Sequence, residues 1–149
     1  MENYILALPT KIRRNFSKLR ISAHSLKIET GRHSKPKTPP DKRICDYCNS
    51  LEVENEHHFL LNCPMFNPER QVMFESLNTF LTLDIRDKEN LFTMLMNYLE
   101  GDTEVCKHVC IFINSADSLR GEVPIPTKHS PAHTIQQEFF RLALIQDTG

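Results

Sequence analysis

The sequence predicts a mainly α-helical protein in which a small Cys-Cys-His-Cys element lies between a basic N-terminal helix and a small helical bundle. Three observations support this prediction. Apolar residues recur with a helical period over much of the chain, segments that alternate like strands are nearly absent, and three cysteines and two histidines are grouped within nineteen residues. The length of 149 residues suits one domain of ordinary size.

Residues 1–33 are expected to form a basic amphipathic helical segment. Thr10 is suited to cap the helix, because a threonine hydroxyl accepts a hydrogen bond from the free amides of the first turn. Gly31 is expected to end it, since glycine readily adopts the left-handed conformation that follows many helices. The spacing of the apolar residues places them on one stripe, which consists of Ile12, Phe16, Leu19, Ala23 and Leu26.

Residues 67–121 are expected to form three acidic helices with short connections. Their predicted starts are Asn67, Asp87 and Thr103. The first is expected to carry the apolar residues Val72, Met73, Leu77, Phe80 and Leu81. The second is expected to carry Leu91, Leu95 and Leu99 and to end at Gly101. The third should end at Gly121, and residues 122–149 are expected to form an irregular tail with a short helix that starts at Thr134.

The net charge of −1 conceals a strong asymmetry along the chain. Residues 1–43 contain eleven Lys or Arg and three acids, whereas the remaining residues contain seven basic and sixteen acidic side chains. This distribution favours an N-terminal end that faces a polyanion; the alternative is that the two ends neutralise each other within the fold. The apolar runs are too short for a transmembrane helix, and the chain has no glycine-rich phosphate-binding loop.

Residues 34–66 are expected to form a zinc knuckle with a Pro-rich basic lead-in. Cys45 and Cys48 are separated by two residues, so that one tight turn can direct both thiolates at one ion. Cys63 and one of two adjacent histidines follow at a distance that allows a tetrahedral site to close. Four soft or borderline ligands without a carboxylate favour Zn²⁺ over Mg²⁺ or Ca²⁺. Because the protein fills all four positions, the Zn²⁺ is expected to be structural.

The spacing favours His58 over His57 as the fourth ligand. His58 and Cys63 are five residues apart and would not share a face of a straight α-helix. However, Cys63 precedes Pro64, and a residue before proline is disfavoured in the helical conformation. Cys63 can therefore leave the helix and turn back toward the ion.

The expected charge of the site and the other cysteines of the chain also need an interpretation. A centre of three thiolates, one imidazole and Zn²⁺ carries a net charge of −1, which Lys42 and Arg43 are expected to offset. The alternative is that the cysteines are buried free thiols beside an incidental pair of histidines. Cys106 and Cys110 lie one turn apart on an apolar helical face, and we expect them to be ordinary core thiols.

The segments around the first three cysteines carry a more specific pattern. Residues 19–32 read LRISAHSLKIETGR, residues 43–48 read RICDYC, and residues 53–64 read VENEHHFLLNCP. Together they resemble the region that follows the polymerase domain of non-LTR retrotransposon (LINE-type) reverse transcriptases, whose zinc knuckle has the pattern Glu-x-x-His-Phe-x-x-x-Cys-Pro. The resemblance covers residues 12–75 well, the helices to residue 120 loosely and the last 28 residues not at all. It implies that the histidine before the phenylalanine, His58, is the metal ligand.

The resemblance implies a fragment that holds RNA or DNA during target-primed reverse transcription. The Tyr-x-Asp-Asp polymerase motif, an endonuclease cluster and the common hydrolase motifs are absent from the sequence, so we expect no enzyme activity and no small-molecule substrate. The expected partners are an RNA or DNA backbone and a retroelement polymerase or another protein, with no membrane. We expect the chain inside the cell, in the nucleus or cytoplasm, and not secreted.

The predicted nucleic-acid contacts come from the basic helix and the lead-in. Phosphate contacts are expected from Arg13, Arg14, Lys18, Arg20, Lys27, Arg32, Lys35, Lys37, Lys42 and Arg43. Tyr47 is expected to stack on an unpaired base or, alternatively, to pack over its own zinc loop. Two further alternatives for the whole chain are a zinc-stabilised protein-interaction module, with the acidic helices as its contact surface, and a non-functional retroelement relic.

Overall fold

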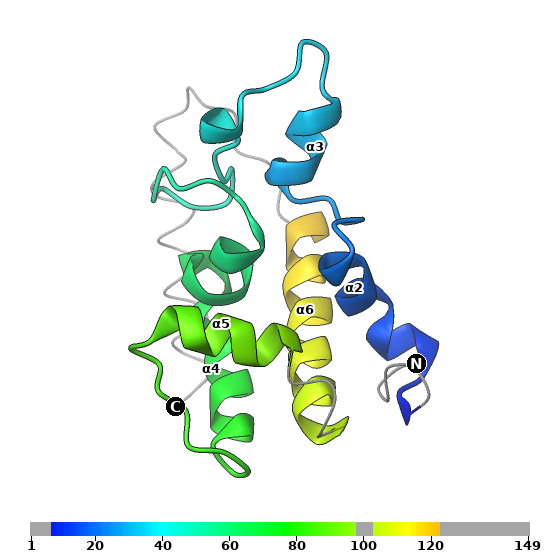
Figure 1. Cartoon of the computed structure of the whole chain (residues 1–149), viewed down its shortest axis with the longest axis vertical. Coiled ribbons are helices and arrows are strands. Elements are labelled where there is room, and N and C mark those ends of the chain that lie inside the picture. The colour runs from blue at the N-terminus through cyan, green and yellow to red at the C-terminus, as the bar shows by residue number, and fades with distance from the viewer. Residues whose placement is uncertain (1–6, 98–102, 123–149) are drawn as a thin grey trace.

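A computed structural model describes residues 7–97 and 103–122, which form helices joined by loops (Figure 1). The predicted mainly α-helical class is confirmed. The described ranges contain no strand, and Ile44 and Val53 make an isolated antiparallel bridge. No helix within these ranges has the length and apolar character needed to cross a membrane.

Helix α6 (Thr103–Glu122) is the centre of the bundle. Helices α2 (Thr10–Arg20) and α4 (Asn67–Leu77) pack along it on two sides, and α5 (Lys88–Asn97) crosses α4 and reaches α6 (Figure 1). Because α6 has neighbours on several sides, its buried residues cover more than one narrow stripe. These residues are Val105, Cys106, Val109, Cys110, Phe112, Ile113 and Ala116. Cys106 and Cys110 are thus core thiols, as predicted, with sulfur atoms 3.9 Å apart.

The three predicted helix starts of the bundle are confirmed. Helix α4 begins at Asn67 and α6 at Thr103, and α5 begins directly after Asp87, whose carboxylate accepts a hydrogen bond from an amide of the first turn. One helix end differs from the prediction, since α4 ends at Leu77 and leaves Phe80 in an exposed turn. The predictions for Leu99, Gly101 and the tail with its helix at Thr134 fall on residues outside the described ranges.

The predicted N-terminal helix is wrong in its extent, because α2 stops at Arg20. Ser22 adopts a left-handed conformation with φ 55°, and the amides of Ser22 and Ala23 donate to the carbonyls of Leu19 and Lys18. This pair of bonds is a Schellman motif, which satisfies the last carbonyls of a helix and reverses the chain. A serine in place of the usual glycine explains why the sequence does not reveal this end.

Gly31 lies inside a second helix, α3 (Lys27–His33), rather than ending the first. A Cβ atom added to Gly31 would lie 2.8 Å from Cγ and 2.9 Å from Cδ of Arg43. The Arg43 side chain is fixed in this position, since its Nε donates to the carbonyl of Thr38 and its Nη1 to the carbonyl of Ile28. Gly31 is therefore required for close packing, not for a left-handed turn.

The predicted Pro-rich lead-in forms a closed loop. The amide of Thr38 donates to the Gly31 carbonyl at 3.0 Å and to the Ser34 hydroxyl at 3.1 Å. A short 3₁₀ turn, η1 (Pro40–Lys42), follows and leads into the first cysteine. The prolines fix backbone angles, and the polar side chains between them supply the hydrogen bonds that close the loop.

We expect Gly31→Ala to lower the free energy of unfolding by about 1–3 kcal/mol, because the new methyl group must displace a side chain that is held at both ends. Gly121→Ala in α6 is the matched control, since a Cβ there meets nothing within 4 Å. That variant should leave the free energy unchanged or raise it by up to about 1 kcal/mol. Urea denaturation of both variants measures the difference, and equal effects would contradict the packing role of Gly31.

Candidate metal centre

The structure brings together the four predicted ligands Cys45, Cys48, His58 and Cys63. Their ligand atoms all lie within 4.8 Å of one another, and all four residues are buried. Cys45 follows the bridge between Ile44 and Val53, where its amide donates to the carbonyl of Glu52. This short backbone pairing places the Cys-x₂-Cys turn against the helical turn that carries the other two ligands.

The separations between ligand atoms suit a single tetrahedral ion. The sulfur atoms of Cys45 and Cys63 are 4.0 Å apart, and Sγ of Cys48 lies 3.4 Å from Nε2 of His58. A tetrahedral ion with bonds of about 2.3 Å to sulfur and about 2.0 Å to nitrogen requires separations of about 3.8 Å and about 3.5 Å. The four side chains can therefore hold one metal ion with little rearrangement.

A π-helical turn, η2 (His58–Asn62), brings His58 and Cys63 to the same side of the chain. The amide of Cys63 donates to the carbonyl of His58 at 2.7 Å, a bond that spans five residues. In a π-helix residues five apart lie one turn apart, so the widened turn removes the angular offset expected from an α-helix. Helical structure in this segment begins at Glu56, two residues before the π-helical turn.

His57 lies outside the cluster and faces α5. Its ring lies 5.0 Å from the ring of Phe92, and its Nε2 lies 3.4 Å from the carboxylate of Glu89. Cys63 has an extended backbone, with φ −59° and ψ 117°, directly before Pro64. This is the departure from the helix that the proline predicts, and it directs Cys63 rather than its neighbours toward the other ligands.

Further hydrogen bonds hold the ligands in place. The amide of Tyr47 donates to the sulfur of Cys45 at 3.4 Å, and the hydroxyl of Ser50 lies 3.0 Å from the sulfur of Cys48. The Nδ1 of His58 donates to the carboxylate of Glu52 at 2.6 Å. A carboxylate on one ring nitrogen fixes the tautomer and presents the other nitrogen, Nε2, to a metal.

The close approach of the four ligands shifts their pKa values. Hydrogen bonds from Cys45 and Cys63 hold the pKa of the Cys48 thiol well below its usual value, and the same bond to Cys48 raises the pKa of Cys45. Burial lowers the pKa of His58, but contacts with Cys48, Cys63 and Glu52 outweigh it and raise the value to about 10. A metal ion must displace these protons, so metal affinity falls as the pH falls.

Arg70 of α4 supports the turn that carries His58 and Cys63. Its guanidinium donates to the carbonyls of Phe59, Leu60 and Cys63 at 3.2, 2.8 and 3.0 Å. These are carbonyl groups at the end of the turn, where the helix leaves acceptors free. Burial lowers the pKa of Arg70 to about 10 against the opposing charges of Cys63 and Glu69, and the side chain stays protonated at neutral pH.

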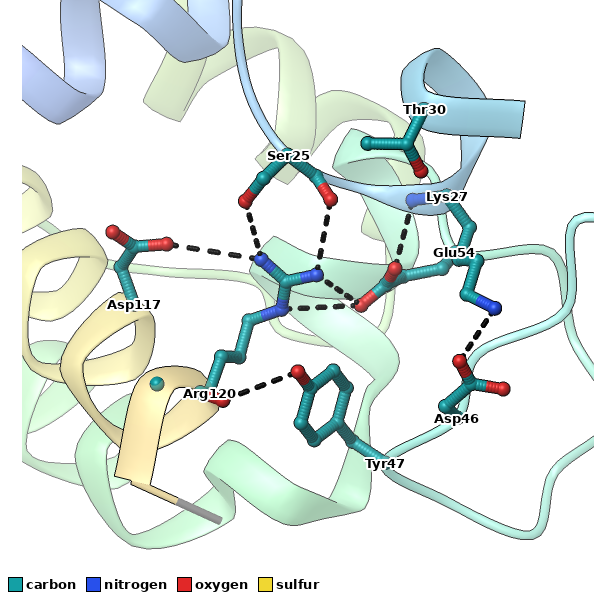
Figure 2. A pocket seen from close by; sticks show the side chains of 9 residues that line it. Ser25, Lys27, Thr30, Asp46, Tyr47, Glu54, Asp117 and Arg120 are labelled. Carbon is teal, nitrogen blue, oxygen red and sulfur yellow. Dashed lines mark hydrogen bonds and ion pairs between the residues drawn. The ribbon is translucent and has the colours of Figure 1, made fainter. Parts of the chain in front are cut away.

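An ionic junction next to the Cys-x₂-Cys turn joins it to α6 and α3 (Figure 2). Glu54, which is 1% exposed, accepts hydrogen bonds from the Lys27 amide at 2.8 Å and from Nε and Nη2 of Arg120 at 3.2 and 2.9 Å. The Tyr47 hydroxyl donates to the Arg120 carbonyl, and the guanidinium of Arg120 lies 5.0 Å from the centre of the Tyr47 ring. These groups line a cavity of about 450 Å³.

Several of the predicted nucleic-acid contacts serve the fold in this structure. Arg43 is buried, and its guanidinium donates to backbone carbonyls, which leaves it little access to a phosphate. Lys27 pairs with Asp46 at 2.5 Å, and Nε of Arg13 donates to the Leu8 carbonyl. The Tyr47 ring lies 5.0 Å from the guanidinium of Arg120 on α6, a contact that neither expectation for this residue includes.

The remaining predicted basic residues are more accessible. Arg20 is half-buried. Exposed side chains extend from α2, α3 and the following loop, and they belong to Arg14, Lys18, Arg32, Lys35, Lys37 and Lys42. Of these, Arg32 pairs with Glu29 at 3.2 Å, and Lys42 lies 3.9 Å from Asp41. The N-terminal charge is therefore only partly neutralised within the fold.

Comparison with protein families, with curated proteins and with solved structures finds no match to this chain. The candidate site therefore rests on the convergence of its ligands. Sequence reasoning missed the residues that support them, Glu52, Glu54, Arg70 and Arg120. A glutamate six residues before a ligand histidine, or an arginine seven residues after a ligand cysteine, has no periodic pattern that would reveal a contact.

We expect Glu52→Ala to weaken metal binding by about 10- to 100-fold, because His58 loses the carboxylate that orients its ring. Glu89→Ala is the matched control, since Glu89 lies beside the non-ligand His57 and should leave the affinity unchanged. Competition with a chromophoric chelator measures both constants. An unchanged affinity in Glu52→Ala would show that the orientation of His58 does not depend on this carboxylate.

Proposed function

We propose that this chain is a non-catalytic, zinc-binding module that holds nucleic acid, similar to the C-terminal part of a retrotransposon reverse transcriptase. The observation that carries the proposal is the convergence of Cys45, Cys48, His58 and Cys63 at tetrahedral spacing. The exposed basic side chains of α2 and of the loop before Cys45 supply the complementary charge for a phosphate backbone. The proposal includes no membrane and no small-molecule substrate.

The donor set supports Zn²⁺ as the ion. Three thiolates and one imidazole are soft or borderline ligands, and Mg²⁺ and Ca²⁺ prefer oxygen. Four buried protein ligands close the tetrahedron and leave no position for an activated water, which is typical of a structural ion. An ion at this position would cross-link the Cys-x₂-Cys turn to the π-helical turn and so stabilise a segment with few apolar side chains.

The resemblance to LINE-type reverse transcriptases supports nucleic acid as the partner. Residues 58–64 read HFLLNCP and agree with the His-Phe-x-x-x-Cys-Pro part of the knuckle pattern. The chain departs from the pattern at Asn55, which stands where the pattern has glutamate. The Asn55 side chain accepts a hydrogen bond from the His58 amide at 2.8 Å and so caps the turn.

We expect the purified protein to contain one zinc ion per chain and to lose helical circular dichroism when a strong chelator removes it. The physical reason is that binding of a structural zinc contributes on the order of 10 kcal/mol to the folding of small elements. Cys48→Ala should lose zinc, whereas Cys106→Ala should keep it. A metal-free protein that stays folded would contradict the zinc assignment.

We expect the logarithm of the nucleic-acid binding constant to fall with the logarithm of salt concentration, with a slope of about −4 to −5 if about five phosphates are contacted. Replacing both Lys35 and Lys37 with Gln should reduce the slope by about 2. Arg86→Gln, on an exposed turn outside the basic segments, is the control and should not change it. Fluorescence anisotropy with a single-stranded oligonucleotide measures the slope, and a flat response would contradict the proposal.

A second candidate function is a protein-interaction module. It is favoured by apolar side chains that are exposed on and beside α4 and α6, which belong to Val72, Phe80, Ile85 and Ile111. These positions lie outside the basic segments, so that the two surfaces are separable by mutation. Capture of a specific partner that persists after nuclease treatment, together with a flat salt response, would favour this function over the first.

A further inference from the structure

Arg70 is a buried cation whose hydrogen-bond partners are all neutral. The residue is 4% exposed, and no carboxylate among the described residues lies within ion-pair distance of its guanidinium. It donates to three backbone carbonyls and, at 2.7 Å, to the side-chain oxygen of Asn67, and it lies 5.7 Å from the centre of the Phe112 ring. Carbonyl dipoles and an aromatic face reduce the cost of burying a charge, but they do not neutralise it.

The candidate metal centre next to Arg70 would carry an unbalanced negative charge. Three thiolates, a neutral imidazole and a divalent ion together carry a net charge of −1. Arg70 reaches this centre through Cys63, since Nη2 donates to the carbonyl of that ligand at 3.0 Å. Two buried groups of opposite charge therefore lie side by side. The Glu69 carboxylate also adds negative charge near Arg70, but it makes no hydrogen bond or ion pair with the guanidinium.

We infer that Arg70 is the counter-charge of the metal centre and raises its affinity for a divalent ion, in addition to capping the turn that positions His58 and Cys63. This inference rests on the proposed function, because the charge of −1 requires a divalent ion bound by three thiolates. Arg70 is a positioning and electrostatic residue and not a ligand. Its guanidinium cannot lose its charge at neutral pH, so the compensation is permanent.

The two cations that the sequence suggests for this role are placed elsewhere. Lys42 is exposed and lies beside Asp41, where water screens its charge. Arg43 is buried, but its guanidinium is bound to the carbonyls of Ile28 and Thr38 on α3 and the following loop. Arg70 is the buried arginine that contacts the backbone of a ligand residue.

The test separates charge from hydrogen bonding by comparing Arg70→Lys with Arg70→Gln. Lysine keeps the charge and loses the planar fork, whereas glutamine keeps amide donors and loses the charge. Zinc dissociation constants are measured by competition with a chromophoric chelator. We expect Arg70→Gln to raise the constant by about tenfold or more and Arg70→Lys to raise it by less than about threefold.

Arg43→Gln is the matched control, because it also removes a buried arginine that donates to backbone carbonyls. It should change the zinc dissociation constant by less than about threefold, even where it lowers the thermal stability. Equal increases for Arg70→Lys and Arg70→Gln would overturn the inference, and so would an increase for Arg43→Gln as large as that for Arg70→Gln.

The other possible results also support or overturn the counter-charge role of Arg70. If Arg70→Gln does not fold, Arg70→Lys decides alone: a zinc dissociation constant within about threefold of wild type supports the counter-charge, and a larger increase overturns it. A wild-type chain that binds no zinc would overturn the proposed function together with this inference. A wild-type chain that binds zinc, with Arg70→Gln unchanged, would overturn this inference alone.

Discussion

The hydrogen bond from the Cys63 amide to the His58 carbonyl is the constraint on which the candidate site depends. It widens one helical turn by one residue and so places two side chains five apart on the same side of the chain. In a regular α-helix those side chains would diverge, and the Cys-x₂-Cys turn would face only one of them. Single widened turns of this kind often occur at functional sites, because they direct a side chain away from its regular position.

Buried charges hold this turn and its neighbours to the bundle. Arg70 joins α4 to the π-helical turn, and Arg120 joins α6 to Glu54 in the segment between the second cysteine and the histidine. The burial of such groups is costly unless each finds its partners, so they contribute more to specificity of arrangement than to stability. Alternative packings of the metal-binding segment would leave at least one of these groups without its partners.

The sequence predicts the parts of the structure that follow from short-range patterns. The starts of α4, α5 and α6 and the grouping of the four ligands depend on caps, helical period and fixed spacing, which are local properties. The break after Arg20 was missed because Ser22 takes a conformation usually reserved for glycine. The roles of Gly31 and Arg43 depend on the contact between segments twelve residues apart, and no periodicity encodes such a contact.

The junction at Glu54 also bears on whether the metal-binding segment is an autonomous unit. Its carboxylate receives hydrogen bonds from residues 27 and 120, and the hydroxyl of Tyr47 donates to the last turns of α6. A peptide limited to residues 34–66 would keep every ligand but would expose a carboxylate that the whole chain buries. Unlike a finger that can be transplanted between proteins, this element is completed by chain segments on both sides of it, so grafting it elsewhere would require those segments as well.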